Sequence, residues 1–483
     1  LLVGLLEYYS VKPSDKVLDA SRRLGDFLLR VFDDCAKPEV IERVRGKAAN
    51  GFICFTQFNE GLELLTRATG DTKYREVAAK MLSLLEPPGD QHTHGYLTTL
   101  RGHMMIYEST KDKALLDAVV ARYREMIDIG AVKTNGGVLE YFKKNYNRDE
   151  GCSEADFVRL LLQLWRATGQ AEYLNRAEHC LYNSLFAGQF ATGDFGHHDF
   201  DDRGYYASAG HGRAWWCCTM HGLRALRDVL DNVITQDGTT VSLNLYMPGR
   251  WQGKDITLLV ERTTPPNATP SPAFRVVFEK APSAGVSGGE AYSFLARRAE
   301  WMAGIKITGI PGGEGQGEKT VEESSLVSGD KIFAGDWTVG SAVGTGAVAW
   351  KDGNRMEVQP IYALRLMDGE GKFHLPGDLV TDKPKPAVIF YGPWMMGVDA
   401  YFNPMFHGEP VDNTLLLPGA ATLAGQIAFD RPDDPLLSGP HIELAYMHSG
   451  FSDLCRLSLR PLSEQSSHEP TTVSFWHKVK QAN

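Results

Sequence analysis

The sequence predicts a multidomain protein in which an (α/α)6-type toroid, or α/α barrel, is followed by antiparallel β-sandwich domains. From residue 1 to about residue 233 the apolar residues recur at helical spacing, whereas after about residue 235 they alternate with polar residues. The chain of 483 residues also exceeds the usual size of one domain. We therefore expect a toroid domain over residues 1–235, a β-sandwich over 236–400, and a second sandwich, or the completion of the first, over 401–483.

About nine helices are expected from the helical period. One apolar stripe, for example, passes through Leu116, Val119, Tyr123 and Ile127. The expected helices are residues 1–9, 14–32, 54–68, 72–85, 95–109, 112–129, 153–168, 171–187 and 219–233. Because six helical hairpins need more helices than these, we expect the toroid to lack its amino-terminal part. The first residues have the composition of a helix interior and show neither the basic start nor the cleavage site of a signal peptide.

Similar turns join these helices in pairs. Residues 67–71 and 166–170 both contain Ala-Thr-Gly, and Gly70 and Gly169 suit the left-handed conformation that ends many helices. The copies of this turn are irregularly spaced, unlike the repeats of a stacked solenoid. Helical hairpins with insertions of variable length indicate an α/α toroid.

The second half of the chain has the pattern of many short strands. Val241, Leu243 and Leu245 alternate with Ser242 and Asn244. Further strand candidates are residues 256–260, 274–279, 305–308, 347–350, 356–366, 387–391, 442–446 and 473–476. Stretches rich in glycine and proline separate them, and this pattern is typical of β-sandwiches.

Composition and charge exclude several classes of protein. The net charge is −10, from 50 Lys and Arg against 60 Asp and Glu, and no long basic run is present to bind phosphates. No run of about 18 uninterrupted apolar residues occurs either. We therefore expect neither a nucleic-acid partner nor a membrane-spanning helix. The motifs of P-loop enzymes, α/β-hydrolases, HExxH metalloproteases and dinucleotide-binding domains are missing too. Aromatic residues make up 10% of the chain, which is compatible with carbohydrate binding.

The most unusual feature of the sequence is a pair of adjacent cysteines. Cys217-Cys218 and Glu150-x-Cys152 each precede an expected helix, and helix amino termini lower the pKa of thiols. Three cysteines and one carboxylate make a tetrahedral zinc set. The seven cysteines show no CxxC motif and no disulfide spacing. Taken alone, these residues equally allow ordinary buried cysteines, which are common in protein cores.

Five segments in chain order resemble one family of glycoside hydrolases. They are Glu150-x-Cys152, residues 157–169 (FVRLLLQLWRATG), residues 177–183 (AEHCLYN), Trp216-Cys217-Cys218 and residues 242–248 (SLNLYMP). The family is glycoside hydrolase family 127, which includes bacterial β-L-arabinofuranosidases and was once catalogued as a domain of unknown function. The resemblance spans most of the chain, through the helical part and the sandwich part alike.

The resemblance implies a zinc-dependent retaining exo-glycosidase that acts on β-L-arabinofuranosides or related plant-glycan sugars. In that family, Zn2+ is held by the glutamate, the cysteine two residues later and the cysteine pair, and the first cysteine of the pair is the nucleophile. Carried over to this sequence, the metal ligands are Glu150, Cys152, Cys217 and Cys218, and Cys217 is the catalytic nucleophile. Zinc keeps a thiolate deprotonated at neutral pH, and the thiolate is the attacking form.

The acid/base residue is the least direct part of the resemblance. The family places it in a glycine-rich segment before the Glu-x-Cys motif, which corresponds here to residues 135–142. Glu140 is the only carboxylate in that segment and is the expected catalytic acid/base. Its separation from Glu150 is shorter than in the arabinofuranosidases, which leaves the identity of the sugar open. A solvated loop glutamate is the alternative interpretation.

Four residues are expected to bind the substrate: His92, His94, Trp216 and His221. His92 and His94 precede a helix, where they can form hydrogen bonds to sugar hydroxyls, and His221 follows the cysteine pair by one helical turn. Trp216, together with Trp215, can stack on the face of a sugar. The alternatives are structural histidines and tryptophans of the core. Metal binding by His92-x-His94 is disfavoured because the pattern offers no third donor nearby.

Two other functions fit parts of the pattern. A polysaccharide lyase of the α/α toroid type shares the expected architecture, but it has no use for a cysteine pair. A non-catalytic carbohydrate-binding protein with a structural zinc ion would also have four protein ligands. The expected partner is a carbohydrate, and a homodimer is compatible with the strand pattern. A thiolate zinc site fits the bacterial cytoplasm or the periplasm, so the localisation stays open.

Overall fold

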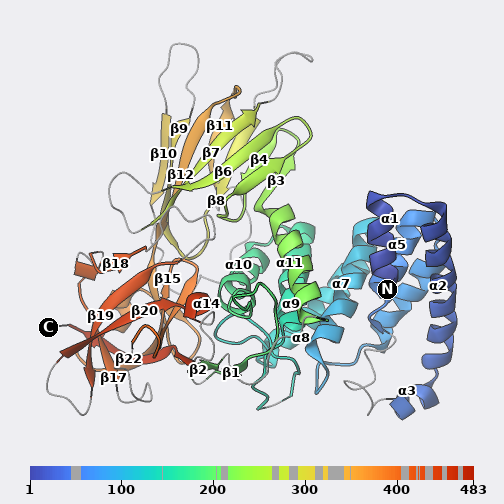
Figure 1. The fold of residues 1–483 in the computed structure, drawn as a ribbon, viewed down its shortest axis with the longest axis horizontal. Coiled ribbons are helices and arrows are strands. Elements are labelled where there is room, and N and C mark those ends of the chain that lie inside the picture. The colour runs from blue at the N-terminus through green and yellow to red at the C-terminus, as the bar shows by residue number, and fades with distance from the viewer. Residues whose placement is uncertain are drawn as a thin grey trace. The chain divides into compact units, whose positions relative to one another are not determined.

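The structure is a computed structural model in which helices form the first part of the chain and sheets the second (Figure 1). It describes residues 1–483 except 45–55, 144, 203, 208–215, 264–270, 282–291, 311–318, 325–341, 349, 404–412, 420–421, 424, 430–438, 449–453, 466–471 and 483. The chain divides into two compact units. Unit 1 comprises residues 1–169, 194–197 and 213–225, and unit 2 comprises residues 170–193, 198–212 and 226–483. Among the described residues, no helix is long and apolar enough to cross a membrane.

The helices of unit 1 lie where the apolar period predicts them, with ends that differ by a few residues. They are α1 (Leu2–Val11), α2 (Asp15–Cys35), α3 (Pro38–Val44), α5 (Asn59–Thr69), α6 (Lys73–Lys80), α7 (Thr93–Thr110), α8 (Lys113–Asp128), α9 (Gly151–Thr168) and the first turns of α11 (Cys218–Val233). The short helix α3 was not predicted, because seven residues carry too little of the helical period. The predicted helix over 72–85 is α6 followed by a 3-10 turn, Met81–Leu84.

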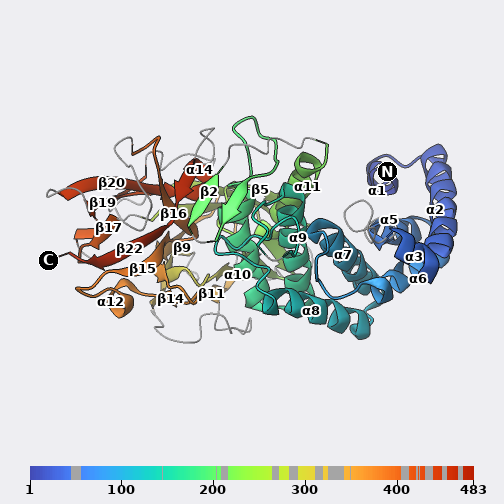
Figure 2. The same ribbon diagram turned by 90° about the horizontal axis from the view of Figure 1, so that it is seen from below.

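In unit 1, helices α1, α2, α5 and α6 pack against one another, and Figures 1 and 2 show α1, α2 and α5 side by side. Buried side chains of these helices, together with Met81 of the 3-10 turn and Ile106 of α7, form a cluster of Leu2, Leu6, Phe32, Leu62, Leu65, Tyr74, Ala78, Met81 and Ile106. Gly70 and Gly169 end α5 and α9 with φ of 74° and 71°, which confirms the two predicted left-handed caps. Helices α7 and α9 pack against each other and are buried on every side over residues 95–106 and 151–162. These two central helices carry most of the site described below.

Close packing at Gly102 of α7 leads to a testable prediction. A Cβ at this position would lie 2.2 Å from Oδ1 of Asn59, and the amide of Asn59 is held by hydrogen bonds to Thr99 O (2.7 Å) and Glu60 N (2.8 Å). We expect Gly102→Ala to lower the free energy of unfolding by about 2 kcal/mol, because a packed core resists added volume. Urea unfolding measures this.

A matched control is Gly4→Ala on helix α1, where an added Cβ meets no atom within 4 Å. Alanine is the better helix former, so this variant should gain about 0.5–1 kcal/mol. If Gly102→Ala gained stability in the same way as Gly4→Ala, the close contact with Asn59 would be contradicted.

Unit 2 begins with α10 (Ala171–Cys180) and a π-helical turn, η2 (Leu181–Leu185), and continues into two sheets. The four-stranded sheet has the order β11-β8-β4-β3, and the six-stranded sheet has the order β10-β9-β12-β7-β6-β5. Their strands are β3 (Ile234–Asp237), β4 (Thr240–Leu243), β5 (Gly249–Gln252), β6 (Thr257–Thr263), β7 (Ala273–Lys280), β8 (Tyr292–Arg297), β9 (Met302–Ile310), β10 (Lys319–Ser324), β11 (Ala342–Val348) and β12 (Arg355–Tyr362). The predicted alternation is visible in β7, which buries Phe274, Val276 and Phe278 on one face.

A third sheet contains the remaining strands. They are β1 (Asp199–Asp201), β2 (Tyr205–Ala207), β13 (Leu364–Met367), β14 (Phe373–His374), β15 (Lys385–Tyr391), β16 (Trp394–Asp399), β17 (Asn413–Leu417), β18 (Ile427–Ala428), β19 (His441–His448), β20 (Leu454–Pro461), β21 (Thr472–Ser474) and β22 (Trp476–Gln481). Because β16 pairs with both β15 and β20, the strands β16-β20-β19-β17-β22-β15 form a closed ring. The predicted domain boundary at residue 400 lies between β16 and β17 of this sheet. Strands β1 and β2 come from the predicted toroid region and join the same sheet through β21.

Asn183 connects the helical start of unit 2 to its third sheet. Its Nδ2 donates to Pro393 O at 3.0 Å, and its Oδ1 accepts from Met395 N at 2.6 Å. The side chain is fully buried within the π-helical turn. A side-chain amide that bonds to a strand in this way supplies the hydrogen-bond partners that the backbone of a neighbouring strand would otherwise supply. The segment over residues 177–183, one of those that carry the family resemblance, is therefore an anchor for β16.

Candidate active site

Unit 1 brings together Glu150, Cys152, Cys217 and Cys218, as the resemblance implies. One ligand atom from each lies within 4.8 Å of the others. The Sγ atoms of Cys152 and Cys218 are 3.6 Å apart, and those of Cys217 and Cys218 are 3.8 Å apart. Tetrahedral sulfur ligands about 2.3 Å from a zinc ion lie about 3.8 Å from one another, whereas a disulfide would hold them at about 2.05 Å. The spacing therefore fits a metal-binding set, and none of the six cysteines that the structure describes is in a disulfide.

Two helix starts place these ligands. Glu150 is the N-cap of α9, Cys152 lies in its first turn, and Cys218 is the first residue of α11. A Cβ at Gly151 would lie 3.1 Å from the Cβ atom of Cys218, so this glycine permits the close approach of the two helix starts. Free backbone N–H groups and the helix dipoles there favour negatively charged ligands.

The cluster concentrates negative charge on one sulfur. Hydrogen bonds from the thiols of Cys152 and Cys218 hold the pKa of Cys217 well below its usual range. The corresponding hydrogen bond to Cys217 raises the pKa of Cys152. Burial raises the pKa of Glu150 to about 7. Cys217 is half-buried, whereas the other three ligands are buried, so the most acidic thiol is also the most accessible member of the cluster.

Glu140 lies beside this cluster and is not a solvated loop residue, because only 7% of it is exposed. Backbone hydrogen bonds from Glu140 N to Arg148 O and from Thr93 N to Glu140 O fix its position. Its carboxylate accepts from Tyr146 Oη and from Arg148 Nε, the latter at 2.7 Å. The ligand atoms of His92, Glu140 and Glu150 all lie within 4.8 Å of one another.

The histidines expected to bind substrate are also in this region of unit 1. His92 Nε2 lies 3.5 Å from Glu150 Oε2, and burial together with the neighbouring His94 lowers the pKa of His92 to about 4. The rings of His94 and His221 approach edge to face with centroids 4.4 Å apart. Trp216 is 61% exposed, so it is not a core residue. Trp215 lies outside the described residues.

Several residues of the site were missed at the level of sequence. Tyr146 and Arg148, for example, hold Glu140. Asp156 lies 2.7 Å from His94 Nδ1. A signal was available for Asp156 alone, because it follows Cys152 by one helical turn on α9 and therefore shares its face.

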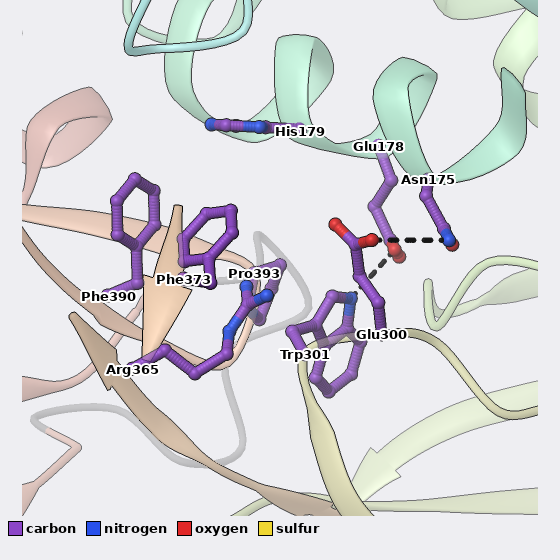
Figure 3. Close-up of a pocket in the computed structure, with 9 residues that line it drawn as sticks. All are labelled: Asn175, Glu178, His179, Glu300, Trp301, Arg365, Phe373, Phe390 and Pro393. Carbon is purple, nitrogen blue, oxygen red and sulfur yellow. Dashed lines mark hydrogen bonds between the residues drawn. The ribbon is translucent and has the colours of Figure 1, made fainter. Parts of the chain in front are cut away.

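Unit 2 contains a separate enclosed space (Figure 3). It is lined by Asn175, Glu178, His179, Glu300, Trp301, Arg365, Phe373, Phe390 and Pro393. Glu178 accepts from Trp301 Nε1 at 2.7 Å and pairs with Arg297 at 3.0 Å, while the Arg365 guanidinium stacks 4.2 Å from the Phe373 ring. The space has room for about one water molecule, which is too little for a sugar. We therefore interpret the residues around this space as a buried cluster of charged groups that anchors α10.

The sequence of the amino-terminal part of the chain is similar to one family of enzymes. Residues 1–230 match the family described as beta-L-arabinofuranosidase, GH127 catalytic domain. No curated protein matches the sequence.

Three solved structures share the fold over 99% of this chain. A GH127 beta-L-arabinofuranosidase from Geobacillus stearothermophilus T6 is 14% identical, with a TM-score of 0.59 over 79% of its own chain. A second GH127 beta-arabinofuranosidase is 16% identical, with a TM-score of 0.64 over 75% of its chain. A protein titled glycoside hydrolase is 15% identical, with a TM-score of 0.62 over 83% of its chain. Residues 1–230 thus match the catalytic domain of glycoside hydrolase family 127, and the chain shares its fold with solved enzymes of that family.

Proposed function

We propose that this protein is a zinc-dependent retaining exo-glycosidase in which the Cys217 thiolate is the nucleophile. A glycoside hydrolase acts on a carbohydrate, and the related enzymes point to β-L-arabinofuranosides or similar plant-glycan sugars. The observation that carries the proposal is the convergence of Glu150, Cys152, Cys217 and Cys218 within 4.8 Å. A bound zinc ion would keep these thiols deprotonated at neutral pH. The partial exposure of Cys217 favours a reactive site over a purely structural one.

The first half of the reaction would use Cys217 and Glu140. The Sγ atom of Cys217 attacks the anomeric carbon while the bond from that carbon to the leaving oxygen breaks, and Glu140 gives its proton to this oxygen. The product is a thioglycosyl group on Cys217. Tyr146 and Arg148 hold the carboxyl group of Glu140 in place during this transfer.

Hydrolysis of the thioglycosyl group would complete the reaction. Glu140, now a carboxylate, takes a proton from water, the water oxygen attacks the anomeric carbon, and the C–S bond breaks to return the thiolate. Two displacements at one carbon give net retention. His92, His94 and His221 would form hydrogen bonds to sugar hydroxyls, and Trp216 would stack on the sugar.

The finer architecture is also part of the proposal. The hairpin turns at Gly70 and Gly169 support helices arranged as an (α/α)6 toroid over residues 1–235. The alternation of buried residues in strands such as β7 supports β-sandwich packing after residue 235.

Substitution of Glu140 tests its role as acid and base. We expect Glu140→Gln to reduce kcat/KM by about 10²–10³-fold on arabinofuranosides with a sugar or alkyl leaving group, because these need protonation. On 4-nitrophenyl β-L-arabinofuranoside, whose leaving group is a weak base, the loss in the glycosylation step should be less than about tenfold. Steady-state kinetics on both substrates measure the difference.

The control is Glu125→Gln on the partly exposed side of α8, which should leave both activities unchanged. Equal losses of Glu140→Gln on both substrates would assign the acid to another residue. An inactive wild-type enzyme on every furanoside would contradict the proposed substrate class.

A further inference from the structure

We propose that Asp156 is a positioning residue that holds His94 and His221 with their Nε2 atoms available to the substrate. The inference rests on the proposed function, in which both histidines bind the sugar. Asp156 lies on α9 one turn after Cys152, so the helix that starts the metal-ligand set also carries this carboxylate.

Both imidazoles converge on the Asp156 carboxylate. Its Oδ2 lies 2.7 Å from Nδ1 of His94 and 3.6 Å from Nδ1 of His221, just beyond hydrogen-bond length. The hydroxyl of Thr98 donates to the same oxygen at 2.9 Å. The Asp156 side chain has no exposed surface, whereas the side chains of His94 and His221 are 15% and 22% exposed. The Nδ1 edge of each ring therefore faces the buried carboxylate of Asp156. The exposed part of each histidine side chain is not the Nδ1 edge.

The carboxylate itself is fixed by arginines. Its Oδ1 accepts from Nη1 of Arg101 at 2.8 Å and lies 3.4 Å from Nη1 of Arg159. Burial alone would raise the pKa of Asp156, but Arg101 and His221 hold it well below its usual range. An ionised carboxylate with several donors around it is a rigid acceptor.

A second buried carboxylate in the same network provides a comparison. Glu60 of α5 is 4% exposed and lies 3.7 Å from Arg101 and 3.9 Å from Arg159. It also accepts from Arg224. The ion pairs of Glu60 are with arginines, whereas Asp156 also holds the two histidines. Asp156 and Glu60 thus share a structural role, and only Asp156 has the positioning role.

The chemistry of this contact sets the proton on each ring. An ionised carboxylate only accepts hydrogen bonds, so the Nδ1 atom that faces it carries the proton of a neutral imidazole. The lone pair then lies on Nε2, which becomes an acceptor for a sugar hydroxyl. Carboxylate partners fix the tautomer and orientation of functional histidines in this way. His94 and His221 would therefore present two acceptors side by side, matched to two donating hydroxyls.

A second metal ion is the competing interpretation, because His94, Asp156 and His221 place ligand atoms within 4.8 Å of one another. The Asp156 carboxylate, however, already faces Arg101 and Arg159, whose positive charges oppose a cation. The positioning role is therefore favoured, and metal analysis is included in the test.

The test compares Asp156→Asn with Glu60→Gln in the full chain. Each variant removes one buried negative charge next to the same two arginines, so a structural role alone predicts the same result for both. We expect kcat/KM on 4-nitrophenyl β-L-arabinofuranoside to fall about 10–100-fold in Asp156→Asn and less than about threefold in Glu60→Gln. Melting temperatures of the two variants should fall by similar amounts.

A spectroscopic readout separates positioning from stability and needs no substrate. Two-bond 15N–1H spectra of protein labelled with 15N-histidine report the tautomer of each ring, and His94→Gln and His221→Gln assign the signals. We expect both rings to carry the proton on Nδ1 in the wild type and in Glu60→Gln. In Asp156→Asn, His94 should shift toward the Nε2–H form.

The outcomes distinguish this inference from the proposed function. Nε2–H tautomers in the wild type, or equal kinetic losses in the two variants, would overturn the positioning role. A second zinc ion per chain that Asp156→Asn removes would replace it with a metal site. If no furanoside were cleaved, the proposed function would fail, and the wild-type spectrum would still decide the role of Asp156, even if Asp156→Asn did not fold.

Discussion

Cys217→Ser should abolish turnover while leaving the fold and most of the bound metal in place. A serine hydroxyl stays protonated at neutral pH, so it cannot supply the attacking anion that we propose for the Cys217 thiolate. We expect kcat/KM on 4-nitrophenyl β-L-arabinofuranoside to fall by at least about 10³-fold. Because Glu150, Cys152 and Cys218 remain as ligands, the metal content should change much less than the activity.

The matched control for this prediction is Cys35→Ser on α2, which replaces a free, partly exposed thiol of the same unit. This variant should keep full activity, and circular dichroism should show the same helix content in both. Wild-type activity in Cys217→Ser would remove this cysteine from the mechanism. An activity loss accompanied by a proportional loss of metal would be explained by the role of Cys217 as a ligand alone and would leave its nucleophilic role unsupported.

Cys152→Ser should release the metal and, with it, the activity. Cys152 is fully buried, and its sulfur lies 3.6 Å from that of Cys218, whereas Cys217 is half-buried, so water can replace the lost sulfur at Cys217 but not at Cys152. We expect about one zinc ion per chain in the wild type, as in tetrahedral sites of this composition. The variant should retain well under half of this amount. Mass spectrometry of metals in protein purified without chelator or added zinc measures both values.

Cys455→Ser on β20 is the control, because this free thiol belongs to unit 2 and its variant should keep the metal. A wild-type chain with no metal and with all thiols free in reducing buffer would contradict the zinc-thiolate mechanism. The low pKa of Cys217 would then depend on the hydrogen bonds from Cys152 and Cys218 alone.

The helices and the cysteine cluster could be predicted from sequence for different reasons. Helix positions follow from local periodicity and from capping glycines such as Gly70 and Gly169, whose left-handed conformation the structure confirms. The convergence of Cys152 with Cys217 could not come from periodicity, because the two lie on separate helix starts. It came from the resemblance, and the spacing of the sulfurs now supports it.

Other features were missed because their signals are not local. Strand β16 is buried at all six positions, so it shows no alternation of apolar and polar residues. Asp156 shares a helix face with Cys152, but its ion pair with Arg101 of another helix leaves no signal in the local pattern. Strand β2 pairs with β21 from near the carboxyl end of the chain. The sequence of so short a strand does not indicate a partner that is so distant in the chain.

The division of the chain between its two units bears on how the protein is synthesised. Residues 170–193 belong to unit 2, and Asn183 bonds to Met395, a residue 212 positions later in the sequence. At a translation rate of about 5–20 residues per second, Asn183 leaves the ribosome about 10–40 s before its partner. During that interval the turn η2, whose Leu181 and Leu185 are buried in the finished protein, lacks the strand β16 that it contacts. If the gene were truncated near residue 235, these leucine side chains would stay exposed. We therefore expect the helical half expressed alone to aggregate and to depend on chaperones.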